Sequence, residues 1–457
     1  MPLDLDRLIE ATGGRLVGPT PMAPLAVAVT DGRQATSGSL FFALKGATAD
    51  GHDFVGQAVA KGCSAVVASR PVADVDLSAV SVIMVEDTWQ ALFAVARDRL
   101  AAARPRVVGI TGSTGKTSTK ELTAAALGRF FGVLATAGNL NTQTGVPLTL
   151  MQLEPGLHQV AVLEMGLQVA GDIGLLARLA SPEVGVITNI GVAHMESLGS
   201  VQAIVEAKAE LLSELPSTGW AVLNRDDPHF DKLRRSTAAR LLTFGGTPEA
   251  DLRLVAGPHH YWVVVAGVAQ PLPLRLSVLG RHQALNAVAA LAVARVLGLD
   301  LLTAAGALGG VRLSQRLQVV ELGGGRTLVD DSYNASPDSV LAAFETVTAE
   351  FAGRPLVVVL GDMLELGPVA LEAHRQMGAW AARFADRLAV TGAMADLVAD
   401  AAVACGLDPD RVLSSPSLAT VVEWLVSTGS PGDVILVKAS RGIGLDRLVA
   451  DLKARWR

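Results

Sequence analysis

Apolar and polar positions alternate along the chain in a pattern that changes twice and divides it into three sections. Residues 1–86 hold short apolar runs separated by turn residues, such as LAVAV and SVIMV, which predicts a small α/β domain. Residues 87–312 and 313–457 each alternate longer apolar runs with stretches of helical period. That alternation predicts a parallel sheet covered by helices on both faces, so we expect three α/β domains, the last one Rossmann-like.

The second section changes its pattern before it ends. Between residues 243 and 279 the runs DLRLVAG, YWVVVAG and LPLRLSV are short and separated by Gly and Pro, which predicts antiparallel strands at an edge of the sheet. The following run, RHQALNAVAALAVARVLGL, has helical period and is expected to end at a glycine cap, Gly298.

Length and composition bound the class of protein. A chain of 457 residues exceeds one ordinary core and fits roughly two to four domains. Half of the residues are hydrophobic and the mean hydropathy is +0.40, but the apolar runs are much shorter than the roughly 20 residues that cross a bilayer. The first ten residues, MPLDLDRLIE, are acidic and no apolar segment follows them, so no export signal is expected. We therefore expect a cytoplasmic protein without membrane insertion.

Charge and cysteine content exclude further classes. The net charge of −6 is small for this length, and no cluster of Lys and Arg suits a phosphate backbone, so nucleic acid is not an expected partner. The two cysteines, Cys63 and Cys405, lack metal-ligand spacing, which argues against a disulfide framework and a zinc site. We also expect the chain to act as a monomer.

The stretch GITGSTGKTSTK, residues 109–120, joins an apolar run to a helical one. A strand ending at Thr111, a glycine-rich turn and a helix starting near Lys116 would aim backbone N–H groups at one point, which is a site for an anion. Lys116 suits the outer phosphates of a nucleoside triphosphate, and the Thr117 hydroxyl suits magnesium. Because Ile110 stands where the usual G-x-x-x-x-G-K-[ST] pattern has glycine, a plain turn stays the alternative. The residues expected to hold the nucleotide here are Gly112, Ser113, Thr114, Gly115, Lys116, Thr117 and Ser118.

The loop TGSTGKT resembles the phosphate loop of the Mur ligases and the folylpolyglutamate synthetases, ATP-dependent enzymes that join a carboxylate to an amine. Further motifs come in the order seen in Mur ligases: GNLNTQTGVPLTL, LEMG, TNIGVAHMESLGS and EAKAEL. The similarity extends to TDGR, LFFALKG and DGHDF in the first section and to DDSYNASPDS and GDMLELG in the third. It implies that ATP first converts the carboxylate into an acyl phosphate, which the amine then attacks.

The resemblance also implies that Lys116 and magnesium ions, of which two are expected, hold the transferring phosphoryl group. Thr117, Glu164 and His194 are then metal ligands, although the residue types alone also allow a solvated strand-end glutamate and a structural histidine. Lys208 lies in a run of helical period, where a helix-surface lysine is the default. Its context resembles the lysine that Mur ligases carbamoylate, and carbamoylation would make it an oxygen donor for a second magnesium.

Other residues are expected at the nucleotide by resemblance. Asn139 faces the γ-phosphate, and His282 and Asn286 contact the adenine side. The last two stand four apart on one face of the expected helix, where capping is the alternative. Arg316 and Asp331 are expected to reach the nucleotide from the third section. A nucleotide held by two domains binds best in a closed cleft that excludes water, so we expect an open form without substrates.

The resemblance further implies where the substrates bind. The residues expected to anchor a uridine diphosphate are Asp31, Arg33, Lys45, Gly46, Asp50 and His52, for which surface solvation is the alternative. GDMLELG stands where ligases that add diaminopimelate or lysine have Asn-Pro-Arg, which favours D-alanyl-D-alanine as the amine and UDP-N-acetylmuramoyl-tripeptide as its acceptor. The residues expected at these two substrates are Asn141, Thr142, Tyr333, Asn334, Lys438 and Arg441. Thr142 stands where the family usually has asparagine.

Two other functions stay open at this point. A folylpolyglutamate synthetase would share the phosphate loop but lack a uridine-binding first domain. A GTPase-like switch protein is suggested by NRDD, residues 224–227, which distantly resembles the guanine-selecting N-K-x-D motif. That alternative leaves Glu164, His194 and the third section unexplained.

Overall fold

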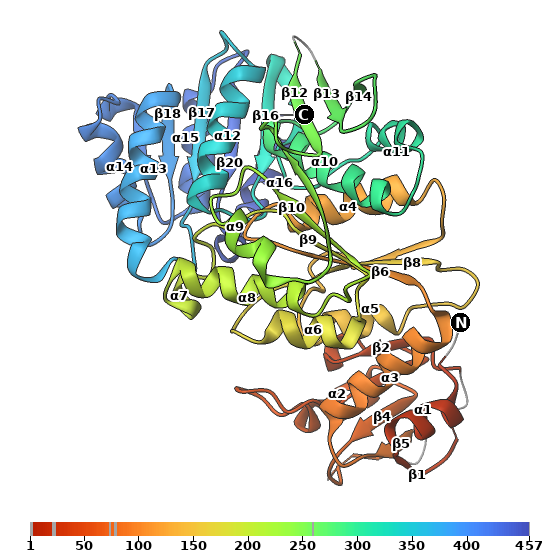
Figure 1. The fold of residues 1–457 in the computed structure, drawn as a ribbon. Coiled ribbons are helices and arrows are strands. Elements are labelled where there is room, and N and C mark those ends of the chain that lie inside the picture. The colour runs from red at the N-terminus through yellow and green to blue at the C-terminus, as the bar shows by residue number, and fades with distance from the viewer. Residues whose placement is uncertain (1–2, 21–23, 73–74, 77–79, 258–259, 457) are drawn as a thin grey trace.

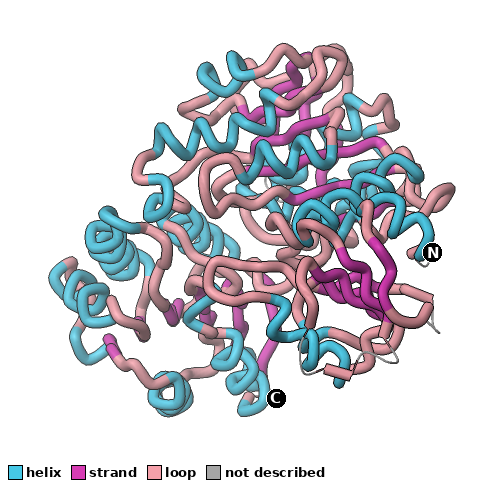
Figure 2. The backbone as a smooth tube through the Cα atoms, turned by 90° about the horizontal axis from the view of Figure 1, so that it is seen from below, coloured by secondary structure: helices cyan, strands magenta, loops and turns pink. Residues whose placement is uncertain are grey.

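The computed structural model describes residues 3–20, 24–72, 75–76, 80–257 and 260–456. Its strands form three sheets that follow one another along the chain (Figure 1). Figure 2 shows the strands in separate groups with helices around them. The predicted architecture of three α/β domains is confirmed. The predicted boundaries, after residues 86 and 312, fall between the sheets and stay predictions.

The N-terminal domain is built on a small, mostly parallel sheet. Its elements are α1 (Leu5–Thr12), β1 (Arg15–Val17), β2 (Val27–Val29), β3 (Ser39–Phe42), α2 (Val55–Ala60), β4 (Ala65–Ala68) and β5 (Ser81–Met84). The strand order is β1-β5-β4-β3-β2, with β1 antiparallel at one edge. The inner strands β3 and β4 are buried along their whole length, as apolar runs in a covered parallel sheet are expected to be.

The central domain contains a sheet of nine strands in the order β14-β13-β12-β11-β10-β9-β6-β8-β7. Its strands are β6 (Arg106–Thr111), β7 (Val133–Ala135), β8 (Val160–Glu164), β9 (Val184–Ile187), β10 (Trp220–Asn224), β11 (Arg240–Gly245), β12 (Leu252–Ala256), β13 (Tyr261–Val265) and β14 (Leu272–Leu274). Its helices are α4 (Lys116–Leu127), α5 (Gly145–Leu150), α6 (Asp172–Ala180), α7 (Met195–Leu198), α8 (Val201–Ser213), α9 (Phe230–Leu233), α10 (Arg281–Val296) and α11 (Leu301–Leu308). Strands β12 to β14 pair antiparallel at one edge, which confirms the prediction from the change of pattern. Gly298, with φ 75°, ends the long helix α10 as predicted.

Helix α3 (Thr88–Ala103) joins the first two domains. It packs against α1 on one side and against α5 and α6 on the other. Its buried residue Leu92 belongs to one hydrophobic cluster with Phe42 of the first sheet and Leu150 of the central domain. The N-terminal and central domains therefore share a continuous core.

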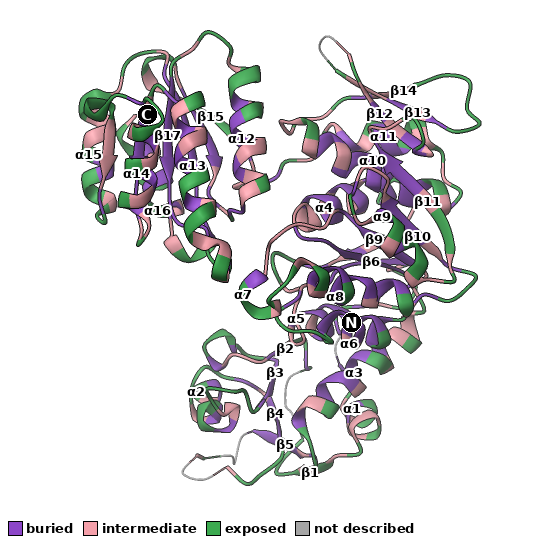
Figure 3. Ribbon diagram, turned by 60° about the vertical axis from the view of Figure 1, so that its left-hand side comes forward, coloured by how far each residue is buried: buried purple, intermediate pink, exposed green. Residues whose placement is uncertain are grey.

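The C-terminal domain has a sheet of six strands in the order β15-β16-β20-β17-β18-β19. Its strands are β15 (Gln318–Leu322), β16 (Arg326–Asp331), β17 (Leu356–Leu360), β18 (Arg387–Val390), β19 (Val412–Ser414) and β20 (Val434–Lys438). Its helices are α12 (Pro337–Glu350), α13 (Ala370–Phe384), α14 (Ala395–Ala404), α15 (Leu418–Thr428) and α16 (Asp446–Arg455). Val358 packs into one hydrophobic cluster and its neighbours Val357 and Val359 into another, so both faces of the sheet are covered. Figure 3 shows the sheets buried and the outer faces of the helices exposed.

Among the described residues, every helix is too short or too polar to cross a lipid bilayer.

Candidate active site

A cleft of about 870 Å³ lies between the central and C-terminal domains. Its walls include the loops that follow the carboxyl ends of β6, β8 and β9 and of β16 and β20, which is where open α/β sheets bind ligands. The predicted residues that line it are Ser113, Thr114, Gly115, Lys116, Thr117, Ser118, Asn139, Asn141, Thr142, Glu164, His194, His282, Asn286, Arg316, Asp331, Tyr333, Asn334, Lys438 and Arg441. Gly112, Lys208 and the six residues predicted in the N-terminal domain lie outside its lining.

The phosphate loop has the predicted form, because β6 ends at Thr111 and α4 begins at Lys116. At two positions of the phosphate loop, both the backbone conformation and the lack of space for a Cβ require glycine. Gly112 has φ 152°, and a Cβ there would overlap the hydroxyl of Thr188. Gly115 has φ 79°, and a Cβ there would lie 2.5 Å from Oδ1 of Asn286.

The segment after β9 holds the phosphate loop in place. Ser113 N–H donates to the backbone oxygen of Asn189 (2.9 Å), and Thr114 N–H donates to its side-chain Oδ1 (3.0 Å). The Thr188 hydroxyl donates to the backbone oxygen of Thr114 (2.6 Å). Sequence reasoning used the motif TNIGVAH only for its histidine. The same motif was the signal for Thr188 and Asn189, which support the loop.

The NRDD stretch also has a structural role. The Asp227 carboxylate accepts the Ile190 N–H (2.6 Å) and so supports the segment after β9. Asp226 accepts the N–H groups of Gly246 (2.6 Å) and Thr247 (3.0 Å). With both carboxylates bound to backbone groups, the resemblance to a guanine-selecting motif loses its support.

Lys116 is folded back onto the loop that it follows. Its Nζ donates to the backbone oxygens of Gly112 (2.8 Å) and Ser113 (3.2 Å). Burial lowers the pKa of Lys116 below its ordinary value, while Glu164 opposes that shift. A phosphate group bound in the loop would offer the ammonium group stronger acceptors than these carbonyls.

Glu164 lies at the end of β8 and is 2% exposed. Its Oε1 accepts a hydrogen bond from Asn141 Nδ2 (2.7 Å), whereas Oε2 is buried and meets no hydrogen-bond partner among the described residues. A buried carboxylate oxygen without a partner is costly unless a cation or a donor binds it. This fits a magnesium ligand. Asn141, which was predicted to contact substrate, orients this carboxylate.

The part of the chain that the structure describes holds no cluster of three His, Cys, Asp or Glu side chains suited to a metal. Magnesium does not need one, because it binds proteins through one or two carboxylates together with water and substrate phosphates. Glu164, Thr117 and the histidine His194 all line the same cleft as the phosphate loop. The donor set therefore fits magnesium bound with a nucleotide.

His194 precedes α7 and has φ 67°, in the left-handed region. Its Nδ1 lies 2.9 Å from Oε2 of Glu365, which belongs to the C-terminal domain. The hydrogen bond from His194 lowers the pKa of Glu365 below its ordinary value. Sequence reasoning did not identify Glu365 individually, although its motif GDMLELG was noted.

The default prediction that Lys208 lies on a helix surface is wrong, because the residue is buried. It is 0% exposed in α8, and its Nζ donates to the backbone oxygen of Gly112 (3.1 Å). Burial, together with the charge of Lys116, holds the pKa of Lys208 well below its ordinary value. The helix places it under the phosphate loop because its other buried residues, such as Leu211, pack on the sheet. This environment favours the neutral amine of Lys208 over its ammonium form.

The predicted adenine-side pair lies on one face of α10. Burial lowers the pKa of His282 to about 4, so its imidazole is neutral at pH 7. Asn286 is 7% exposed; its Nδ2 donates to Gln283 (3.0 Å), and its side chain packs against Gly115. The pair therefore presents neutral polar groups beside the phosphate loop.

The C-terminal wall of the cleft combines cations with a tyrosine. Arg316 lies over the ring of Tyr333 at 4.3 Å, and Arg441 lies 5.9 Å from the same ring. Lys438, one of the residues expected at the two substrates, is 2% exposed and is paired with Asp331 at 2.6 Å. The ammonium group of Lys438 is therefore already bonded to a carboxylate. Arg441, with a side chain 59% exposed, is the more accessible cation.

The residues predicted to anchor a uridine diphosphate lie in the N-terminal domain, apart from the cleft. Arg33 makes a local pair with Asp31 (2.8 Å). The carbonyl of Lys45 accepts from Trp89 of α3 (3.0 Å), which ties the Lys45–Gly46 turn to the junction with the central domain. The predicted contacts of these side chains with a ligand stay predictions.

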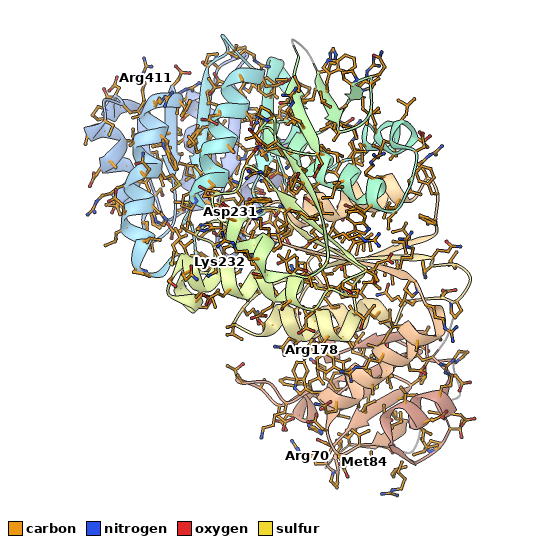
Figure 4. All side chains as sticks on the ribbon, viewed as in Figure 1. Arg70, Met84, Arg178, Asp231, Lys232 and Arg411 are labelled. Atoms are coloured by element: carbon orange, nitrogen blue, oxygen red, sulfur yellow. The ribbon has the colours of Figure 1, made fainter. Side chains whose placement is uncertain are left out.

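His52 is buried within the N-terminal domain. It is 5% exposed; its Nδ1 lies 2.6 Å from Asp50, and its Nε2 accepts the Ser69 N–H (2.9 Å). Arg70 pairs with Asp50 at 3.4 Å and lies at the end of the domain that points away from the other two (Figure 4). Surface solvation, the alternative for this group of residues, does not describe His52, because both ring nitrogens are bonded within the domain.

The two domains that form the cleft are in contact at the loops that carry Glu196 and Glu365. Glu196 N–H of the central domain donates to the backbone oxygen of Glu365 (3.2 Å). A Cβ on Gly367 would lie 2.8 Å from Cα of Glu196, so the backbones are in close contact. The expected open form without substrates stays a prediction.

The fold and the cleft define a multidomain P-loop nucleotide-binding protein. Three family models match consecutive parts of the chain: "Mur ligase family, catalytic domain" at residues 27–100, "Mur ligase middle domain" at 110–294 and "Mur ligase, glutamate ligase domain" at 315–441. The chain belongs to the Mur ligase family.

Individual relatives match over nearly the full length. The UDP-N-acetylmuramoyl-tripeptide–D-alanyl-D-alanine ligase of Bacillus subtilis (strain 168) is 36% identical over 432 residues, which cover 93% of this chain and 92% of that protein. A crystal structure of MurF from Acinetobacter baumannii superposes with a TM-score of 0.86 at 29% identity and covers 99% of both chains. The MurF ligase of Thermotoga maritima in complex with ADP gives a TM-score of 0.79 at 30% identity, with 94% of this chain and 97% of that chain covered.

Proposed function

We propose that this chain is an ATP-dependent ligase that joins D-alanyl-D-alanine to the carboxylate of UDP-N-acetylmuramoyl-tripeptide and releases ADP and phosphate. The observation that carries the proposal is the similarity to the Bacillus subtilis ligase over 93% of the chain. The product would be the complete peptidoglycan precursor, and the enzyme would act in the cytoplasm as a monomer.

Phosphoryl transfer is the first step of the proposed reaction. The substrate carboxylate attacks the γ-phosphorus of ATP, ADP leaves, and an acyl phosphate forms. Two anions must approach each other for this, so the site needs fixed positive charge and N–H donors. Lys116 supplies the positive charge, and the backbone N–H groups of the phosphate loop are the donors. Hydrogen bonds that join the loop to Thr188 and Asn189 keep the loop in one conformation.

Metal ligands would complete the site. Glu164 Oε2, the Thr117 hydroxyl and the His194 imidazole would hold magnesium, and carbamoylated Lys208 would hold a second ion. Bound magnesium neutralises charge that develops on the transferring phosphoryl group. The buried, unpartnered oxygen of Glu164 and the depressed pKa of Lys208 support these assignments.

Amide formation is the second step. The amine of D-alanyl-D-alanine attacks the acyl carbon, phosphate leaves, and the amine loses a proton. Arg441 on the C-terminal wall is the accessible cation for the free carboxylate of the dipeptide. Water in the cleft would compete with the amine, so contact between the two domains protects the acyl phosphate.

The experiment that tests the proposal is phosphate release by the full chain with ATP and UDP-N-acetylmuramoyl-tripeptide. D-alanyl-D-alanine, diaminopimelate, glutamate or no amine is added in parallel, and GTP replaces ATP in a matched set. We expect rapid release and a new amide product only with ATP and D-alanyl-D-alanine. Ligation of glutamate instead would favour a folylpolyglutamate-type ligase, and amine-independent hydrolysis of GTP would favour a switch protein.

A further inference from the structure

The segment 361–367, called here the docking loop, is held firmly by its own domain. The Asp362 carboxylate accepts the N–H of Ala393 (2.7 Å). The Met363 N–H donates to Nε2 of the buried His374 (3.0 Å). These bonds tie the loop to two neighbouring segments of the C-terminal domain, so its tip is presented in one conformation.

The tip of the docking loop reaches the central domain. Glu365 has φ 64°, a conformation that side-chain-bearing residues rarely adopt, and it contacts the central domain with both its side chain and its backbone oxygen. Its partner His194 also has a positive φ. Strained residues on both sides of one contact persist only where the surrounding structure holds them, and they cluster at functional sites.

The hydrogen bond between the two side chains fixes the histidine. A carboxylate accepts only, so Nδ1 of His194 carries the proton that lies between it and Glu365. In the neutral imidazole its other nitrogen, Nε2, then has the free lone pair, and the residue lines the cleft. A carboxylate that holds the far side of an imidazole is the usual support of a metal-ligating histidine.

The exposure of the pair argues against a purely stabilising role. The side chain of Glu365 is 63% exposed and that of His194 is 21% exposed. Exposed ion pairs contribute little to the stability of a fold. The docking loop, which is rigid and strained at its tip, therefore acts to orient His194.

We infer that Glu365 is a positioning residue that orients His194 toward a metal in the cleft, and that the metal site is complete only when the C-terminal domain is docked. The inference rests on the proposed function for the identity of the reaction. The contact between the two residues is independent of which amine is ligated.

The test uses the full chain with ADP and measures Mn²⁺ binding by electron paramagnetic resonance. Glu365→Ala removes the hydrogen bond, and Glu365→Gln keeps an acceptor oxygen. Glu372→Ala, at an exposed glutamate of α13, is the matched control. We expect Glu365→Ala to weaken Mn²⁺ binding about 10- to 100-fold, Glu365→Gln to restore most of it and the control to match the wild type.

A second variant separates docking from the side chain itself. Gly367→Ala keeps Glu365 but forces the backbones apart at Glu196. We expect the same loss of Mn²⁺ affinity, with a lowered kcat and an unchanged KM for the UDP-linked substrate. Unaltered Mn²⁺ binding in Glu365→Ala would overturn the inference. If the wild type fails to ligate D-alanyl-D-alanine but Glu365→Ala still loses Mn²⁺, the proposed function is wrong and the inference stands.

Discussion

Asn141 donates a hydrogen bond to Glu164 across 2.7 Å, and the second oxygen of that carboxylate is buried without a hydrogen-bond partner among the described residues. The loop that carries Asn141 is fixed in turn, because Gly166 N–H donates to its backbone oxygen (2.7 Å). The amide thus acts on the metal site through the carboxylate that it orients.

Replacing Asn141 by alanine is expected to lower kcat about 10- to 100-fold, which is the usual cost of losing a group that orients a metal ligand. The dependence of the rate on magnesium concentration should shift to higher concentration in the same assay. Gln152→Ala, at an exposed position after α5, is the control and should behave as the wild type. An unchanged magnesium dependence in Asn141→Ala would contradict the role given to the amide.

Replacing Lys116 by alanine removes a cation from the phosphate loop. We expect kcat to fall by on the order of 10²–10³, the range seen when one stabilising donor is removed from a transition state. Binding of UDP-N-acetylmuramoyl-tripeptide, measured by calorimetry, should not change. Lys232→Ala on α9 is the control. Turnover that survives in Lys116→Ala would remove the basis for phosphoryl transfer at this loop.

Lys208 is expected to link stability to pH. Its folded-state pKa lies well below the ordinary 10.5, so between the two values the unfolded chain binds more protons than the folded one. The free energy of unfolding should therefore rise with pH through that window when carbon dioxide is excluded. Lys208→Met should flatten this rise and increase stability by on the order of 1 kcal/mol at neutral pH, because a buried polar group is removed. Urea titrations at several pH values measure both effects.

Lys208→Met should also lose ligase activity, and mass spectrometry of the native protein tests the reason. We expect the wild type to carry one additional carboxyl group when carbon dioxide is present and the variant to lack it. A fully active wild type without that modification would exclude carbamoylation as a requirement.

Asp331 and Lys438 form a buried pair at 2.6 Å, with side chains 14% and 2% exposed. Removing one partner leaves an uncompensated charge in the interior, so Asp331→Ala should cost about 3–5 kcal/mol of stability. Asp331→Asn, which retains an acceptor oxygen, should cost less. Chemical unfolding of both variants measures the difference, and equal stability of wild type and Asp331→Ala would contradict the cost expected for an uncompensated charge.

Features with a local cause could be predicted from the sequence. The start of α4 at Lys116 and the end of α10 at Gly298 follow from glycine and capping chemistry within a few residues. The short edge strands β1, β7 and β19 have three residues each and carry too few apolar positions to show a period. Their pairing depends on neighbouring strands that lie far away in the sequence.

The residues of the site also fall into two groups, those with a local signal in the sequence and those that depend on distant partners. The phosphate loop could be predicted because its glycines join an apolar run to a helical one, and Glu164 because it ends an apolar run within a motif that resembles the family. The burial of Lys208 and the pairing of Lys438 depend on distant partners, Gly112 and Asp331. A helical period alone gives no sign of what lies above the helix, which is why a surface position was the default for Lys208.

The continuous core that α3 builds between the first two domains has a thermodynamic consequence. Phe42, Leu92 and Leu150 belong to one hydrophobic cluster, whereas Val358 of the C-terminal sheet belongs to another. Groups that share a core melt as one cooperative unit. A differential scanning calorimetry trace of the intact chain should therefore resolve into two transitions, one of them spanning both the N-terminal and the central domain.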